Sequence, residues 1–92
     1  MKQKKRSALL MNVADNVASA LHQLPAGMNV PIEHEQLSEP YAVQVIEDIP
    51  LGHKFALADI PHGQSIIKFG MVIGTATADI RRGAHVSEHN LE

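Results

Sequence analysis

A histidine and a lysine stand side by side after a glycine, in the sequence Gly52-His53-Lys54. A histidine can gain or lose a proton near neutral pH, and a lysine can bind a carboxylate or, once desolvated, act as a base. A glycine lets a ligand approach the backbone closely because it has no Cβ. The three residues are therefore candidates for a site that moves a proton next to an acidic ligand. An ordinary exposed loop is the alternative interpretation.

A second pair of histidines, His85 and His89, lies near the C-terminus. On a helix, residues four apart share one face, and two histidines placed in this way would suggest a metal site. The segment is expected to be a strand, however, where residues four apart lie about 13 Å from each other. That distance is too long for two ligands of one ion, so the spacing argues against a metal site formed by this chain alone.

The segment around Lys68 supplies a second cation. Lys68 is followed by Gly70 and Gly74, which flank a hairpin-like connection. Lys68 is either a solvated strand residue or a second group that binds a carboxylate.

Asp15 and Asn16 precede a segment with helical periodicity. Apolar residues recur there at i, i+3, i+4 and i+7, namely Val17, Ala20, Leu21 and Leu24. We therefore expect one short helix over residues 15–24, with Asp15 as its N-cap. Capping alone would explain the Asp-Asn pair, but a helix N-terminus could also bind an anion.

The turn that carries the His-Lys pair has two further copies in the chain. The pattern Asp-Ile-X-X-Gly occurs at residues 48–52, 59–63 and 79–83. Each copy is expected to end a strand with an inward isoleucine and to close with a glycine that adopts positive φ. Turn formation thus explains the repetition, and only the first copy runs directly into a His-Lys pair.

The remainder of the chain is expected to be β structure. Residues 7–13 could form a first strand, and from residue 28 onward short apolar runs alternate with Gly and Pro. Turn signals at about every 8–12 residues are typical of small all-β domains. We predict a mainly β domain over residues 7–92 with one short N-terminal helix and a polar surface loop at residues 33–40. Residues 1–6 are interpreted as a solvated basic tail, with an anion-binding arm as the alternative.

Composition narrows the class of protein. A chain of 92 residues makes one small domain. It has no cysteine, which excludes disulfides and thiolate chemistry and agrees with a cytoplasmic location. The net charge of −2 gives no case for nucleic acid as a partner. No stretch approaches the roughly 20 apolar residues of a membrane span, and polar residues interrupt the apolar run after the basic N-terminus, so no signal peptide is expected.

Four segments of the chain resemble the N-terminal domain of the altronate and galactarate dehydratase family: "DNVASAL", "IPLGHKFALADI", "IIKFGMVIGTATADI" and "HNLE". The resemblance covers about residues 12–92, and the Gly-His-Lys turn followed by Ile-Lys-Phe-Gly is its most specific part. That domain is of the SAF type, a small β-clip fold. In some members it is a separate small subunit, as in the α subunit of sulfolactate sulfo-lyase.

The resemblance implies β-elimination from a 2-hydroxy acid such as altronate or galactarate, in which a base removes the proton beside the carboxylate. It implies a large dehydratase subunit or a C-terminal catalytic domain as partner, and a divalent metal, typically iron, in the assembled enzyme. The isolated chain is expected to hold no cofactor and to be inactive, and it could also form a homo-oligomer. A non-catalytic SAF-type module that binds an acidic carbohydrate or stabilises a partner is the alternative function.

On this interpretation the candidate residues fall into three groups. The catalytic candidates are His53 and Lys54. The substrate-binding candidates are Asp15, Asn16, Gly52, Lys68, Gly70 and Gly74. The metal-binding candidates are His85 and His89, although Ser87-Glu88 stands where the family often has further histidines.

Overall fold

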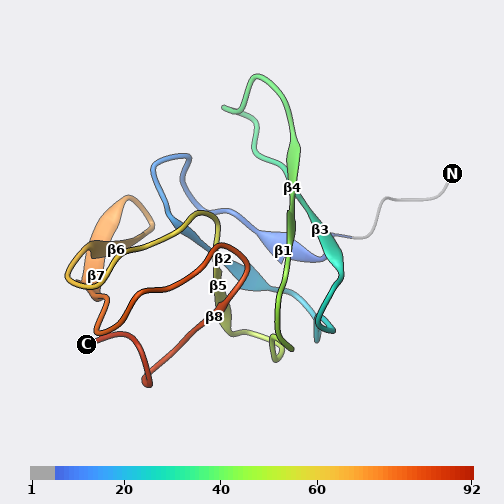
Figure 1. Cartoon of the computed structure of the whole chain (residues 1–92). Helices are drawn as coiled ribbons and strands as arrows, with labels where there is room; N and C mark the ends of the chain where they lie inside the picture. The colour runs from blue at the N-terminus through green and yellow to red at the C-terminus, as the bar shows by residue number, and fades with distance from the viewer. Residues whose placement is uncertain (1–5) are drawn as a thin grey trace, which may run out of the picture.

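The structure, a computed structural model, describes residues 6–92 and consists of short strands joined by turns (Figure 1). The strands are β1 (Ala8–Leu9), β2 (Val17–Ala20), β3 (Asn29–Ile32), β4 (Tyr41–Gln44), β5 (Lys54–Ala56), β6 (Ser65–Lys68), β7 (Met71–Thr75) and β8 (His85–Val86). No helix occurs within the described residues, so none there could cross a membrane. The expected mainly β class is confirmed.

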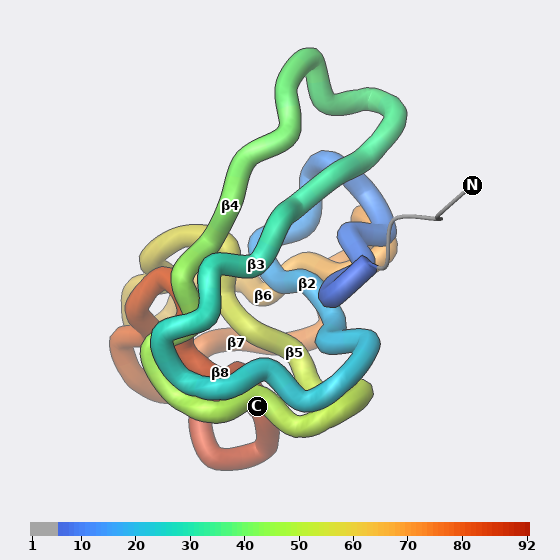
Figure 2. Tube along the Cα trace, turned by 90° about the vertical axis from the view of Figure 1, so that its right-hand side faces the viewer, coloured from blue at the N-terminus to red at the C-terminus, as the bar shows by residue number. Residues whose placement is uncertain are grey.

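The strands form one central sheet and two hairpins. The central sheet is antiparallel with the order β1-β2-β5-β8, while β3 pairs with β4 and β6 pairs with β7. The β6–β7 hairpin lies on one side of the central sheet and the β3–β4 hairpin on the other (Figure 1). The connection between β3 and β4, residues 33–40, projects away from the domain (Figure 2) and has no buried residue, as expected for a surface loop.

The core consists of two apolar clusters that share the central sheet. Successive side chains of a strand point to opposite faces, so Phe55 of β5 packs in one cluster and Ala56 in the other. The first cluster extends to the β3–β4 hairpin through Val30 and Val43. The second cluster includes Ile66 of the β6–β7 hairpin. Each hairpin is thereby fixed to its own side of the sheet.

The Asp-Ile-X-X-Gly units fold as the sequence predicted. Their isoleucines, Ile49, Ile60 and Ile80, are buried, and their glycines adopt φ between 82° and 89°. In each turn the residue after the glycine donates its N–H to the carbonyl three positions earlier, at 3.0 Å. Glycine is favoured at this position because it adopts positive φ without steric cost.

A fourth copy of the turn, residues 24–27, lacks the aspartate and was not recognised in the sequence. Leu24 takes the place of the isoleucine and forms an antiparallel bridge with Ile49, just as Ile60 pairs with Ile80. The turns thus lie in pairs, and the aspartate of one turn accepts a hydrogen bond from the backbone of the other turn. Asp48, for example, accepts from the N–H of Ala26 at 2.9 Å. The four turns are thus two interlocked pairs, which hold the strand ends in place.

The helix expected over residues 15–24 is wrong. Residues 17–20 form β2, which lies between β1 and β5 in the central sheet. A short apolar run can satisfy either periodicity, and an isolated helix of this length is marginal, so pairing with two strands decides the structure. Asp15 therefore caps no helix: its N–H closes a turn on the carbonyl of Asn12 at 3.0 Å. The strand expected within residues 7–13 is confirmed as β1.

The expected basic tail falls almost entirely on residues 1–5, which lie outside the described part of the chain. Arg6, the last residue of that expectation, is exposed. The division into a tail and a single domain stays a prediction.

Candidate functional site

His53 has a fixed backbone and an exposed ring. Its N–H donates to the carbonyl of Pro50 at 3.0 Å within the turn, and its carbonyl accepts from the N–H of Ala20 at 2.8 Å. Gly52 immediately before it has a φ of 82°, and a Cβ added there would meet no atom within 4 Å. The turn therefore presents His53 at the start of β5 with open space beside it.

The ring of His53 is hydrogen-bonded to the ring of His85. His53 Nδ1 lies 2.8 Å from His85 Nε2, and the ring centroids are 5.0 Å apart. The contact arises because β5 and β8 are neighbours in the sheet, with Phe55 opposite His85. In a hydrogen bond between two imidazoles one ring donates and the other accepts, so the pair couples the tautomer of each ring to that of the other.

His89 joins this pair, which corrects the expected separation of about 13 Å from His85 along a strand. The ring centroids of His85 and His89 are 5.3 Å apart. The strand ends at Val86, and Asn90 then turns the chain back: its Oδ1 accepts from the N–H of Ser87 and its Nδ2 donates to the carbonyl of His85, both at 2.9 Å. We call His53, His85 and His89 the histidine cluster.

The surroundings of His85 favour its neutral form. Burial lowers the pKa of the His85 imidazole, and the neighbouring imidazoles of His53 and His89 lower it further. Glu47 opposes this effect, and its carboxylate accepts a hydrogen bond from the backbone N–H of His85 at 3.0 Å. A neutral imidazole can accept a proton, so the cluster is suited to proton transfer.

Lys54 lies in the middle of the central sheet, paired with Ser19 of β2 and Val86 of β8. Burial lowers the pKa of its ammonium group, and the nearby positive charge of Lys68 lowers it further. A shallow pocket of about 260 Å³ lies at this point. It is lined by Gly52, His53, Lys54, Val86, Ser87, Glu88 and Leu91. We call it the His53 pocket; its lysine could hold a carboxylate close to the ring of His53.

The candidates in the β6–β7 hairpin have mixed roles. The Nζ atom of Lys68 lies 5.4 Å from the ring centroid of Phe69, and its charge acts on Lys54. Gly70 forms the hairpin turn with a φ of 71°, and a side chain at Gly74 would overlap Leu91. The two glycines are thus required by the backbone and by packing, whereas Lys68 is the hairpin residue placed to add charge near the His53 pocket.

Asp15 and Asn16 connect the β1–β2 segment to the β6–β7 hairpin. The buried carboxylate of Asp15 accepts from the N–H groups of Phe69 at 3.1 Å and Gly70 at 2.8 Å. The Asn16 side chain accepts from the N–H of Ile67 at 2.8 Å and donates to the carbonyl of Ser65 at 2.9 Å. Both side chains therefore have structural roles, and their contact with a substrate stays a prediction.

The residues present do not fit a metal ion on their own. Within residues 6–92, no group of three or more histidine, aspartate or glutamate side chains is placed to hold one. His53 and His85 also direct one nitrogen each at the other ring. The metal-binding roles of His85 and His89 stay predictions.

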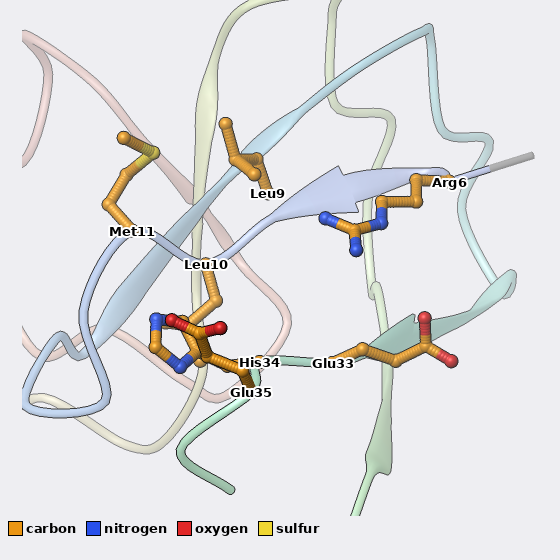
Figure 3. Close-up of a pocket in the computed structure, with 7 residues that line it drawn as sticks. All are labelled: Arg6, Leu9, Leu10, Met11, Glu33, His34 and Glu35. Carbon is orange, nitrogen blue, oxygen red and sulfur yellow. The ribbon is translucent and has the colours of Figure 1, made fainter.

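A second pocket, of about 310 Å³, lies next to β1 (Figure 3) and was not predicted from the sequence. Its lining combines apolar side chains with charges of both signs, and it shares no residue with the His53 pocket. The lining residues are Arg6, Leu9, Leu10, Met11, Glu33, His34 and Glu35. His34 Nδ1 accepts from the N–H of Gln36 at 3.0 Å, which ties this ring to its own loop.

Comparison with known proteins places the sequence beside a group of lyases. Residues 6–92 match the family described as the altronate/galactarate dehydratase SAF domain. Altronate dehydratase of Escherichia coli (strain K12) is 42% identical over 80 residues, which are 87% of this chain and 15% of that protein. Altronate dehydratase of Bacillus subtilis (strain 168) is 34% identical over 85 residues, which are 92% of this chain and 16% of that protein.

A shorter relative is the (2R)-sulfolactate sulfo-lyase subunit alpha of Chromohalobacter salexigens. It is 39% identical over 49 residues, which are 53% of this chain and 52% of that subunit. The chain thus spans about 15% of the length of the altronate dehydratases that it matches.

Proposed function

The chain belongs to the altronate/galactarate dehydratase SAF domain family, and we propose that it is the small N-terminal domain or small subunit of a hydro-lyase. The substrate would be a sugar acid or related 2-hydroxy acid, such as altronate or galactarate. The observation that supports a role in catalysis is the 2.8 Å hydrogen bond between His53 and His85, next to a lysine whose pKa is lowered by burial.

The proposed reaction is a β-elimination. A base takes the proton from the carbon next to the carboxylate, a carbon–carbon double bond forms, and the hydroxyl group on the following carbon leaves as water. The enol so formed rearranges to a 2-keto acid. His53 is the proposed acid or base, and Lys54 is the proposed cation that holds the carboxylate while charge develops on it.

The remainder of the active site would lie outside the described residues. Altronate dehydratases are more than six times as long as the region they share with this chain, since that region is 15% or 16% of their length. A large dehydratase subunit or a C-terminal catalytic domain is the proposed partner, here called the catalytic remainder. The divalent metal, iron in our proposal, would be held mainly by that part. The proposed location of the assembled enzyme is the cytoplasm.

A non-catalytic module is the second candidate function. It is favoured by the two lysines, Lys54 and Lys68, whose charges act on each other and could together bind an acidic carbohydrate. In that case the chain would bind sugar acids without a partner, and replacement of His53 would leave turnover unchanged.

Reconstitution tests the proposal. The isolated chain, supplied with ferrous iron, should not dehydrate altronate or galactarate, whereas the chain with its catalytic remainder should form the 2-keto acid. Turnover by the isolated chain would contradict the claim that catalysis requires the catalytic remainder. An assembled protein that eliminates water from neither sugar acid would contradict the proposed reaction.

A further inference from the structure

The β6–β7 hairpin exposes a run of large apolar side chains. Phe69 is 54% exposed, Met71 64%, Val72 64% and Ile73 39%. We call these four residues the hairpin patch. Successive side chains of a strand point to opposite faces, so Met71 and Val72 of β7 lie on opposite faces of the hairpin. Single exposed apolar residues are ordinary, but a hairpin tip that exposes them on both faces is suited to contact with another molecule.

One edge of the hairpin is also open. The outer edge of β6 is covered by Asn16, whose backbone and side chain both bond to Ile67. On the outer edge of β7, Thr75 forms two backbone hydrogen bonds of 3.0 Å with Glu92 of the C-terminal segment. Within residues 6–92, these are the backbone hydrogen bonds found on that edge of β7. The part of β7 that carries Met71 and Val72 therefore offers backbone groups as well as apolar side chains to a partner.

The hairpin is held rigidly despite its exposure. Its turn is bonded to the buried carboxylate of Asp15, and its inner residue Ile66 is part of the core. A preorganised surface loses little conformational entropy when it binds. The patch is thus suited to docking as it stands.

The hairpin patch borders the His53 pocket. Leu91 lines that pocket and also occupies the space next to Gly74 of β7. Lys68, at the end of β6, acts electrostatically on Lys54 inside the pocket. A polypeptide that covers the patch would therefore extend to the rim of the pocket.

We propose that the hairpin patch is the surface on which the catalytic remainder of the dehydratase docks, and that docking closes the His53 pocket. This rests on the proposed function, because it assumes that the pocket needs groups from a second polypeptide segment. Apolar residues flanked by a carboxylate that faces Lys68 would complement the patch.

Length and charge favour the catalytic remainder as the occupant of the patch. Altronate dehydratases contain far more chain than this domain, and the sulfo-lyase relative is named as a subunit alpha. A second copy of the chain fits less well, because a twofold interface would use the same patch on both sides and so place a hairpin that carries Lys68 on each side of the contact. Like charges held close to each other oppose such a contact.

Photo-crosslinking in the native host tests the docking surface with the complete chain. Val72→p-benzoylphenylalanine places the reactive group in the patch, and Ile46→p-benzoylphenylalanine, at a residue 51% exposed outside it, is the matched control. We expect Val72 to crosslink to dehydratase catalytic sequence, either in a second polypeptide or in the continuation of the same one, and Ile46 not to do so. Crosslinks from Val72 to a second copy, to unrelated proteins or to nothing would overturn the proposal, as would equal crosslinking from Ile46.

The affinity of the assembled pair gives a second readout. Val72→Ser should weaken association with the catalytic remainder about tenfold or more, whereas Ile46→Ser should not. Equal affinities would contradict docking at the patch. The outcome is distinct from that for catalysis: docking at Val72 in an assembled protein that dehydrates neither sugar acid would refute the proposed function alone, and an assembled protein that dehydrates a sugar acid without docking at Val72 would refute this inference alone.

Discussion

His53 and His85 are 32 positions apart in the chain, yet Nδ1 of the first lies 2.8 Å from Nε2 of the second. The contact depends on the pairing of β5 with β8, which sets Phe55 opposite His85 and so places His53, two residues before Phe55, diagonally across from His85. A proton on one ring therefore changes the protonation equilibrium of the other. The ring centroid of His89 lies 5.3 Å from that of His85. This arrangement is the basis of several predictions about pH and activity.

The stability of the domain should fall as the pH is lowered through the range in which histidine titrates. Burial depresses the pKa of His85 in the folded state, so the unfolded chain, with a pKa of about 6.5, binds the proton more readily. The stability due to neutral His85 is present above that value and is lost as the pH falls through the folded pKa. Urea unfolding at about pH 7.5 and pH 5 should show a smaller difference for His85→Gln than for wild type.

His62→Gln is the control for this experiment, since His62 is exposed and lies outside the histidine cluster. It should leave the pH dependence as in wild type. An unchanged pH dependence in His85→Gln would show that the cluster does not disfavour the charged form of His85.

Lys54→Ala should weaken substrate binding and lower kcat together, because a cation on the carboxylate stabilises both the bound substrate and the transition state. Since burial and Lys68 lower the pKa of Lys54, its charge is lost at a lower pH than that of an ordinary lysine. KM of the assembled enzyme should accordingly rise on the alkaline side, and Lys54→Arg should shift that rise to higher pH. A KM profile that is identical in wild type and Lys54→Arg would exclude Lys54 as the carboxylate-binding group.

Asp15→Ala should destabilise the domain by about 2–3 kcal/mol, because it removes a buried carboxylate and leaves two partly buried N–H groups of the hairpin turn without their acceptor. Asp59→Ala is the matched control. Its carboxylate accepts one hydrogen bond, from the exposed N–H of Arg82 at 2.8 Å, and its loss should cost about 1 kcal/mol or less. Chemical denaturation measures the free energy of unfolding of both variants. Equal losses of stability would show that the hydrogen bonds of Asp15 are not the main contacts that hold the hairpin.

Gly83→Ala should be more destabilising than Gly63→Ala. The two glycines share nearly the same φ, 87° and 89°, so both substitutions carry the cost of a left-handed alanine, about 1–2 kcal/mol. A Cβ at Gly83 would also overlap the backbone carbonyl of Gln44, whereas one at Gly63 meets no atom within 4 Å. Thermal unfolding of the two variants should separate the clash from the turn strain, and equal Tm values would argue against the close approach at Gly83.

Local patterns in the sequence predicted the turns, because a buried isoleucine followed by a positive-φ glycine is defined within five residues. The helix expected over residues 15–24 is wrong because the conformation of β2 is decided by its partners, residues 8–9 and 54–56. The separation expected between His85 and His89 is wrong because the strand ends at Val86 and does not continue to His89. The Asn90 side chain turns the backbone after Val86, and the Ser-Glu-His-Asn sequence was a turn signal that could have been read.

The hydrogen bond between His53 and His85 had no signal in the sequence. It depends on the register of β5 against β8, and a shift by one residue would move the two rings to different faces. The His-Lys pair itself could be singled out, both by its residue types and by its resemblance to the dehydratase family. Its neighbours in space could not.

The central claim is that His53 transfers a proton in the assembled enzyme, and steady-state kinetics of His53→Ala beside His62→Ala test it most directly. His62 occupies the same kind of turn in the second copy of the Asp-Ile-X-X-Gly unit, where its backbone N–H bonds to Asp79 at 2.9 Å. We predict that His53→Ala lowers kcat about 10²–10⁴-fold with little change in KM, and that His62→Ala stays close to wild type. Equal kinetics of the two variants would contradict a catalytic role for His53 and leave its turn with a structural role only.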